Sequence, residues 1–268
     1  MAVVDGYDQV AATRLREGPA NDARGAASFT AEAIGRVRRA GVDGPVCVRA
    51  DSGFHGRPVI DACRRADVRF SITVRLNPYL RGHIEAIDES AWTPIPHADW
   101  APNDGQAWVA HTHAPAFADD DEPVRLVVRR VKPKAAKPGQ TPQLLPDWRY
   151  HAFVTDRYHT TTLEADGWHR DHAQVENVIK DLKHHGGLAH LPSGVFGANA
   201  AWLTLVALAH NLGRWTLLTG KGIDCWSSAK TLRRKLIAWP AHIAKHARGV
   251  TLLHGPADWP WAHAVGAP

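Results

Sequence analysis

The sequence predicts an α/β fold, and three observations near its start carry that prediction. Two β-prone runs flank Asp5-Gly6, a dipeptide that favours a tight hairpin turn. The stretch 20–41 predicts a helix that ends near Gly41. A short apolar run within residues 45–54 then predicts a buried strand that stops at Asp51. Strand and helix signals that alternate in this way indicate a layered α/β core.

The elements that follow continue this order and then change in character. Residues 56–66 predict a helix and residues 68–76 a strand, which completes the order hairpin, helix, strand, helix, strand. Prolines then recur between short β-prone runs, which predicts a β-rich insertion. The later expectations are a strand at 149–156, helices at about 160–187 and 197–219, and a basic helical stretch at 227–248 interrupted at Pro240. We therefore expect four parts: residues 1–76, 77–148, 149–220 and 221–268.

The composition is that of a globular protein with an excess of positive charge. The chain has 268 residues, 44% of them hydrophobic, and a formal net charge of +5, which is compatible with a polyanionic partner. Its three cysteines are isolated, so we expect neither a disulfide framework nor a thiolate zinc site, and a reducing cytoplasm fits them best. The N-terminus lacks the pattern of a signal peptide. The most apolar segment, 201–218, contains Arg214 and predicts a buried helix rather than a membrane span.

The segment "HRDHAQVENVIKDLKHH" (169–185) places one carboxylate among basic side chains. Five residues spaced 3, 4, 4 and 3 apart share the spacing of one helix face: His169, His172, Glu176, Lys180 and Lys183. On a single helix they would form a stripe about 80° wide. This spacing alone leaves three interpretations open: a solvated face with a Glu176–Lys180 pair, a zinc site, or a phosphoryl-transfer site. The zinc site would use His169, His172 and Glu176.

Asp51 favours the third interpretation. It follows a predicted buried strand, where α/β proteins commonly place ligand-binding groups, although an Asp before Ser-Gly is also a common turn or cap residue. Mg²⁺ and Mn²⁺ prefer hard carboxylate oxygens, and two-metal sites gather such oxygens from separate elements. Asp51 and Glu176 are therefore the candidate metal-binding and catalytic residues.

Two long segments resemble one protein family, the DDE transposases of bacterial insertion sequences known as transposase DDE domain group 1. "VRADSGFHGRPVIDAC" resembles the family segment around the second catalytic Asp. "HRDHAQVENVIKDLKHHGGLAHLPSGVFGANAAWLTLVALAHNLGRW" resembles the segment around the catalytic Glu. The tail "TLRRKLIAWPAHIAKHARGVTLL" is also similar, so the resemblance covers nearly the whole chain.

The resemblance implies a ribonuclease H-like, retroviral-integrase-like core with a β-rich insertion before the final catalytic helix. Three carboxylates would bind two Mg²⁺ or Mn²⁺ ions for DNA strand cleavage and transfer. Asp51 matches the second carboxylate and Glu176 the third. Related transposases surround this Glu with a Tyr–Arg–Glu–Lys signature of DNA-phosphate contacts. The matching positions here are His169 for Tyr, His172 for Arg, Lys183 for Lys, and Lys180 as a further basic position.

The resemblance also implies that one catalytic group is missing. The first Asp of such a core lies on a first strand that precedes a hairpin, and this sequence begins inside what resembles that hairpin. We expect the first strand and its Asp to be absent, as in a C-terminal fragment of a transposase, with Asp5 and Asp156 as weaker substitutes. Such a chain would be marginally stable and would not cut DNA alone.

The expected partners follow from the same resemblance. They are double-stranded DNA, as transposon ends and target, and a second copy of the chain in a synaptic complex, with no membrane. Further phosphate contacts are expected in the basic tail, at Arg233, Arg234 and Lys235. The expected location is the bacterial cytoplasm, at the nucleoid. Two alternatives stay open: a non-catalytic DNA-binding or dimerising remnant, and an unrelated metal-dependent nuclease.

Overall fold

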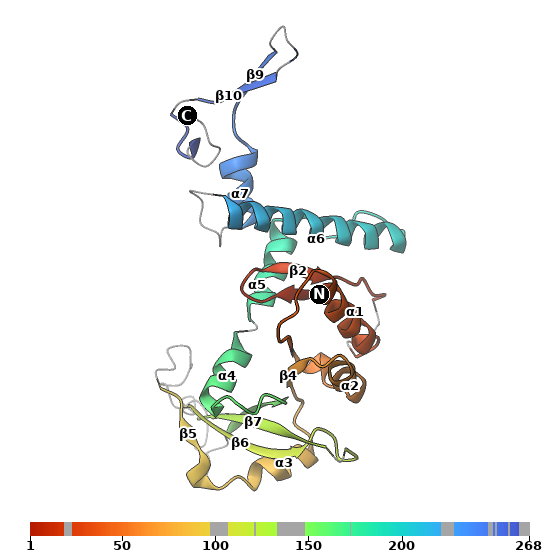
Figure 1. The fold of residues 1–268 in the computed structure, drawn as a ribbon, viewed down its shortest axis with the longest axis vertical. Helices are drawn as coiled ribbons and strands as arrows, with labels where there is room; N and C mark the ends of the chain where they lie inside the picture. Colours follow the sequence, from red (N-terminus) through yellow and green to blue (C-terminus); the bar gives the residue numbers. More distant parts are fainter. Residues whose placement is uncertain are drawn as a thin grey trace, which may run out of the picture. The chain divides into compact units, whose positions relative to one another are not determined.

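The protein divides into two compact units, which are described separately (Figure 1). Unit 1 joins residues 1–16 to residues 173–268, and unit 2 is residues 17–172. The structure, a computed structural model, describes residues 1–18, 23–96, 107–120, 122–132, 148–171, 173–220, 228–245, 249, 251–256 and 258–262.

Unit 2 is built on one six-stranded sheet. Its strands are β3 (Cys47–Ala50), β4 (Arg69–Thr73), β5 (Thr93–Pro94), β6 (Ala107–Pro115), β7 (Pro123–Val131) and β8 (Arg149–Thr155). Their order across the sheet is β3-β4-β8-β7-β6-β5; the β3–β4 pair is parallel and the other pairs are antiparallel. The strands β5, β6 and β7, which fall in the β-rich stretch expected at 77–148, extend the sheet that begins with β3 and β4. The mixed α/β fold predicted from the sequence is confirmed.

Helices cover both faces of this sheet. The helices of unit 2 are α1 (Ala26–Arg39), α2 (Arg57–Arg65), α3 (Pro78–Glu85) and α4 (Thr162–Arg170), with short turns η1 (Ser52–Phe54) and η2 (Glu89–Ala91). Alternate residues of β7 point to opposite faces. Leu126 and Val128 pack in a core with Ile60 of α2 and Leu80 of α3, whereas Val127 packs in a second core with Ala165 of α4. Because both faces are covered, β7 is buried along almost its whole length.

Local sequence signals set the ends of these helices. Gly41 has φ 89°, a left-handed conformation that Gly adopts readily, and it follows the end of α1 as predicted. At the start of α4, the Thr161 hydroxyl accepts a hydrogen bond from the Glu164 amide at 3.2 Å. The Glu164 carboxylate in turn accepts one from the Thr161 amide at 2.9 Å, so α4 begins at a complete capping box.

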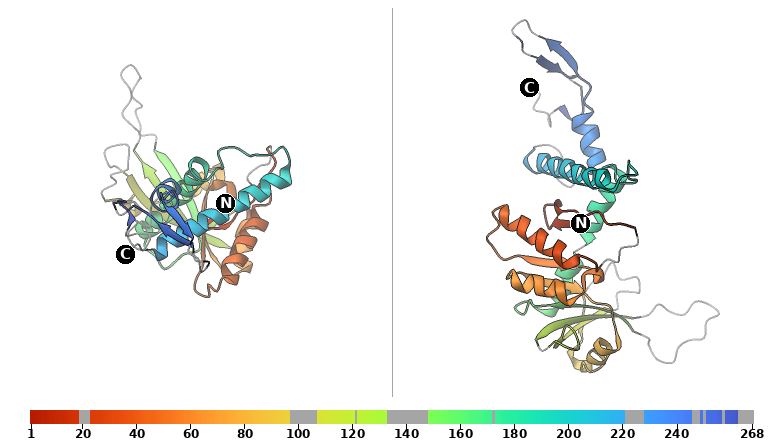
Figure 2. Two further views of the ribbon diagram at one scale, coloured as in Figure 1. Left: turned by 90° about the horizontal axis from the view of Figure 1, so that it is seen from above. Right: turned by 90° about the vertical axis from the view of Figure 1, so that its right-hand side faces the viewer.

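Unit 1 combines the N-terminal hairpin with the helices that follow α4 in the sequence (Figure 2). Its elements are β1 (Ala2–Val4), β2 (Gln9–Ala12), α5 (Ala173–His184), α6 (Phe196–Thr219), α7 (Ala229–Leu232), the π-helical turn η3 (Arg233–Ile237), β9 (His242–Lys245) and β10 (Thr251–His254). Val10 of β2, Leu182 of α5 and Val206 of α6 meet in its buried core.

Side chains of α6 attach the hairpin to this core. The Asn211 amide accepts from the Val10 backbone N–H at 2.7 Å and donates to the Val10 carbonyl at 2.9 Å. Asn211 therefore satisfies both backbone groups of Val10, as a neighbouring strand would. The His210 Nε2 lies 2.8 Å from the Asp8 carbonyl and donates to it, since a carbonyl oxygen only accepts.

Three sequence predictions about elements differ from the structure. The single helix expected at about 160–187 is two helices, because α4 ends at Arg170 and α5 begins at Ala173. Beyond Pro240 the tail forms the antiparallel β9–β10 pair instead of more helix. The helix expected to be buried at 201–218 is buried on one face only, since Leu205 and Leu208 are 59% and 54% exposed. Within the described ranges, no helix is both long and apolar enough to cross a bilayer.

Candidate active site

Asp51 lies at the carboxyl end of β3, in unit 2. The strand runs parallel to β4, and the chain leaves the sheet at Asp51 through the short turn η1. The Asp51 Oδ1 accepts a hydrogen bond from the Gly53 backbone N–H at 3.0 Å and so caps this turn. The residue is exposed. Asp51 is therefore a cap, as its Ser-Gly context also suggested, and within the described part of the chain no hydrogen bond engages its second carboxylate oxygen.

Asp156 follows β8, which runs antiparallel to β4, so it lies at the other end of the sheet strands from Asp51, which follows β3. The β4–β8 register pairs Ser71 with Thr155, and the Phe70 amide donates to Asp156 Oδ1 at 2.8 Å. The β3–β4 register puts Asp51 beyond the level of Ile72. This difference corresponds to about 10 Å along the strands. Burial raises the pKa of the Asp156 carboxyl, and the Phe70 amide and Arg69 counter part of that effect.

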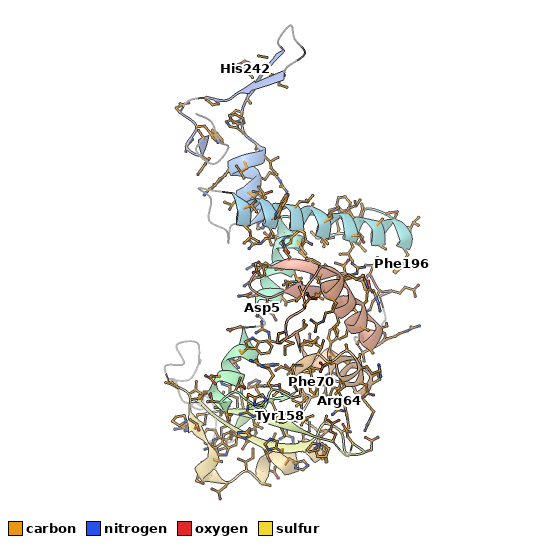
Figure 3. The ribbon with its side chains drawn as sticks, in the orientation of Figure 1. Asp5, Arg64, Phe70, Tyr158, Phe196 and His242 are labelled. Carbon is orange, nitrogen blue, oxygen red and sulfur yellow. The ribbon has the colours of Figure 1, made fainter. Side chains whose placement is uncertain are left out.

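Asp5 also does not act as a strand-borne acid. It is exposed in the turn between β1 and β2, which contains Gly6 at φ 76° and Asp8 at φ 53° (Figure 3). The turn is thus longer than the two-residue hairpin turn that the Asp5-Gly6 dipeptide predicts. A carboxylate at a hairpin turn has no rigid strand to position it.

Glu176 lies on the first turns of α5, in unit 1. Val178 and Leu182 bury the other side of this helix in the unit 1 core, which leaves Glu176, Lys180 and Lys183 exposed. In the described part of the chain no ion pair joins Glu176 to Lys180. The Glu176 carboxylate therefore does not form the Glu176–Lys180 pair that the first interpretation, a solvated helix face, expects.

His169 does not share the helix of Glu176. It occupies the last turn of α4 and is 5% exposed. Its Nδ1 lies 2.7 Å from the Ser71 hydroxyl and its Nε2 3.0 Å from the Thr73 hydroxyl, and the ring stacks on Phe153 at 4.0 Å. Both ring nitrogens are thus engaged in the core of unit 2. His172 lies outside the described residues, so the contact with DNA expected of these two positions stays a prediction.

The three basic residues predicted in the tail have different surroundings. Arg233 donates from Nη2 to the His185 carbonyl at 2.9 Å, next to the end of α5. The Arg234 guanidinium and the Lys235 ammonium instead lie over the Trp261 ring, at 5.4 and 5.6 Å from its centre. The sequence could not predict that these adjacent residues have different partners. The partners are set by the turn η3 and lie far away in the sequence, at His185 and Trp261.

A residue that the sequence did not single out organises this region of unit 1. Asp181 of α5 accepts hydrogen bonds from the Ala229 backbone N–H, at 3.3 and 3.1 Å to its two oxygens, and from His185 Nδ1 at 2.8 Å. The sequence signal for Asp181 is weak: it is an acid among basic residues on α5. It is not on the helix face that the spacing of Glu176, Lys180 and Lys183 defines, so that face drew attention away from it.

The comparison with known families decides which group of proteins this arrangement belongs to. Residues 2–267 match the family described as Transposase DDE domain group 1. The chain belongs to transposase DDE domain group 1. No curated protein sequence matches the chain. The resemblance drawn from the Asp51 and Glu176 segments is therefore confirmed, and the match extends over nearly the whole chain.

Membership of transposase DDE domain group 1 associates the chain with DNA transposition and with DNA as the substrate. The family is generally dependent on divalent metals. The donors present fit such an ion in kind, because Asp51 and Glu176 each offer exposed, hard carboxylate oxygens. Among the described residues no three potential ligands form a cluster, and the two acids belong to different units.

Proposed function

We propose that this chain carries the second and third metal-binding carboxylates of a DDE transposase, Asp51 and Glu176, in a ribonuclease H-like core. The observation that carries the proposal is the exposed Asp51 at the end of β3, in a chain that matches the family from residue 2 to 267. A bound pair of Mg²⁺ or Mn²⁺ ions would supply the activation of water or of a DNA 3′-hydroxyl. The two carboxylates would hold those ions.

We further infer that the core lacks the strand that bears the first catalytic Asp. The edge of the sheet in unit 2 supports this inference. In the described part of the chain, β3 pairs only with β4, so β3 forms one edge of the six-stranded sheet. A further strand would pair at this edge, and an Asp on that strand would complete the set of three acids.

A DNA cleavage assay tests this proposal. The chain is incubated with Mn²⁺ and with DNA that carries the transposon ends. We expect the chain to bind this DNA without cutting it, because two carboxylates do not complete a two-metal site. Efficient cutting by the chain alone would overturn the inferred absence of the first Asp.

A second arm tests the two acids themselves. An N-terminal extension that supplies the first strand and its Asp from another member of the group is expected to produce cleavage. Asp51→Asn and Glu176→Gln should each then abolish cleavage. Glu85→Gln, which alters an exposed acid at the end of α3, is the matched control and should leave cleavage unchanged. Cleavage that survives both site substitutions would favour an unrelated nuclease.

We also propose that the chain forms a homodimer, in line with a synaptic complex. The exposed face of α6 supports this. Four large apolar residues on it are each more than half exposed and are spaced 3, 4 and 3 apart: Leu205, Leu208, Leu212 and Trp215. On a helix this spacing forms one stripe about 80° wide, the pattern of a helix–helix seam. A second copy would offer the same stripe in return.

A further inference from the structure

Unit 1 contains a hollow whose lining is entirely basic. The hollow has a volume of about 570 Å³ and is lined by Lys180, His184, His185, Lys230 and Arg233. The first three come from α5 and the residue after it, and the last two come from α7 and the turn η3. Segments about 50 residues apart in the sequence thus bring five nitrogen-bearing side chains to one place, and none of the described residues that line it is acidic.

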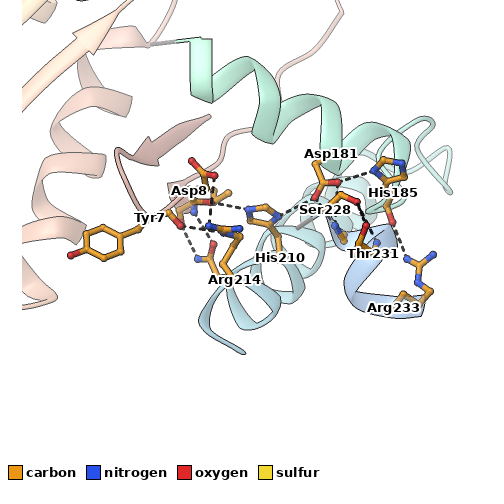
Figure 4. Close-up of polar contacts among 12 residues, drawn as sticks. Tyr7, Asp8, Asp181, His185, His210, Arg214, Ser228, Thr231 and Arg233 are labelled. Carbon is orange, nitrogen blue, oxygen red and sulfur yellow. Dashed lines mark hydrogen bonds and ion pairs between the residues drawn. The ribbon is translucent and has the colours of Figure 1, made fainter. Parts of the chain in front are cut away.

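Asp181 fixes the two walls of this hollow to each other (Figure 4). Its carboxylate accepts a hydrogen bond from the Ala229 N–H at the start of α7 and another from His185 Nδ1, directly after α5. Arg233 adds a second tie, from its Nη2 to the His185 carbonyl at 2.9 Å. These bonds set Lys230 and Arg233 beside the C-terminal half of α5.

The same bonds orient His185 toward a ligand. Because Nδ1 donates to the carboxylate of Asp181, Nε2 is the remaining polar atom of a ring that is 32% exposed and lines the hollow. The Asp181 side chain is 18% exposed and is not among the described residues that line the hollow. The Asp181 carboxylate therefore holds Ala229 and His185 in place, and the side chains that face the open side of the hollow are basic.

The charges on this lining favour an anion. Like charges brought to neighbouring positions repel one another, and a bound anion relieves that repulsion. Within the described residues neither Lys180 nor Lys230 is in an ion pair, so both ammonium groups are free to meet a ligand. Phosphate oxygens are strong acceptors for ammonium, guanidinium and imidazole N–H groups.

We propose that this hollow binds a backbone phosphate of DNA. The phosphate belongs to the DNA strand whose cleavage the proposed function assigns to the site of Glu176. This inference rests on the proposed function. Lys180 and His184 lie four and eight residues beyond Glu176, which is about 6 and 12 Å along the helix axis. The phosphate in the hollow thus flanks the phosphate that reacts, and the α7 wall holds the DNA strand in place beside the catalytic helix.

DNA affinity measured as a function of salt tests this assignment. The full chain is titrated into a labelled 30-base-pair duplex, and Lys230→Gln and Arg233→Gln are compared with the unaltered chain. We expect each variant to bind several-fold more weakly and to lower the slope of log K against log salt by about 1, as loss of one phosphate contact does. Lys230→Arg should retain binding. Arg65→Gln, at an exposed position on α2, is the matched control and should leave the slope unchanged.

The possible outcomes separate this proposal from the proposed function. If the chain binds DNA and Lys230→Gln has the affinity and slope of the unaltered chain, the hollow is not a phosphate site and the proposed function stands. If the chain does not bind DNA at all, both fail. Binding of inorganic phosphate that depends on Lys230, without a matching effect on DNA, would overturn the assignment to DNA.

Asp181→Asn tests whether Asp181 is a positioning residue. Removing a negative charge beside a phosphate site raises DNA affinity if electrostatics alone acts. Asparagine keeps one accepting oxygen and replaces the other with a donating NH2 group, which opposes the Ala229 or the His185 N–H, so loss of position lowers the affinity instead. A several-fold fall in affinity supports the positioning role, and a rise overturns it.

Discussion

At the scale of single residues, His169 shows how packing decides the role of a histidine. The sequence placed it on one face with Glu176, but the structure engages both its nitrogens with Ser71 and Thr73 in the core. We expect His169→Ala to lower the free energy of unfolding by about 2–4 kcal/mol, because it leaves a cavity and an unpaired hydroxyl. Urea unfolding measures this. Glu176→Ala, at an exposed site, is the control and should stay within about 0.5 kcal/mol; equal midpoints for the two variants would contradict the core role.

The thiols of Cys47 and Cys63 give a second prediction at this scale. Burial raises the pKa of Cys47 and of Cys63 from 9.0 to about 12. At pH 8 the thiolate fraction is then roughly 1,000-fold lower than for an ordinary thiol, so iodoacetamide should label neither residue until urea is added. Peptide mapping by mass spectrometry reads each site. Because the neutral thiol is favoured in the folded state, its contribution to stability is present below pH 9 and is lost as the pH rises toward 12.

At the scale of elements, a buried ion pair joins α4 to the sheet. Arg129 Nη1 of β7 lies 3.2 Å from Asp166 Oδ2, and the side chains are 1% and 7% exposed. Burial lowers the pKa of Arg129 to about 10 and raises that of Asp166, while each group opposes the shift of the other. Asp166→Leu alone should destabilise the chain by roughly 3–5 kcal/mol, because it removes the carboxylate that faces the buried Arg129 charge. The double variant Arg129→Met with Asp166→Leu should recover most of that loss in urea unfolding; a double variant as unstable as the single would contradict this account.

Elements were predictable where the signal is local. The β-branched run "VRLVVRRV" predicted β7, but its buried arginines need partners such as Asp166, which is 37 residues further along. The end of α4 had no Gly or Pro to mark it. That helix is anchored to unit 2 through His169, whereas Val178 anchors α5 to the core of unit 1. Periodicity that continues across two helices cannot show that they pack in different cores.

At the scale of the whole molecule, the sequence provided candidate site residues, which stay a prediction, but it did not provide the arrangement of the elements that bear them. Asp51 was placed correctly after a strand, since that signal lies within about ten residues. The strand order β3-β4-β8-β7-β6-β5 depends on pairs such as Ser71 with Thr155, which no local pattern encodes. The basic hollow was missed for the same reason, because the segment of Lys230 is held beside α5 by contacts about 50 residues apart in the sequence, from Ala229 to Asp181 and from Arg233 to His185.

Self-association through α6 is the prediction that concerns the molecule as a whole. Leu208 and Leu212 are each more than half exposed at the centre of the stripe, so a charge there leaves the fold intact while it opposes close packing with a second copy. We expect the chain to sediment as a dimer at tens of micromolar, and Leu208→Glu with Leu212→Glu to sediment as a folded monomer. Leu191→Glu replaces another exposed leucine, 45% exposed and off the stripe, and should remain dimeric. A chain that stays monomeric at every concentration would show that something other than a second copy covers this face.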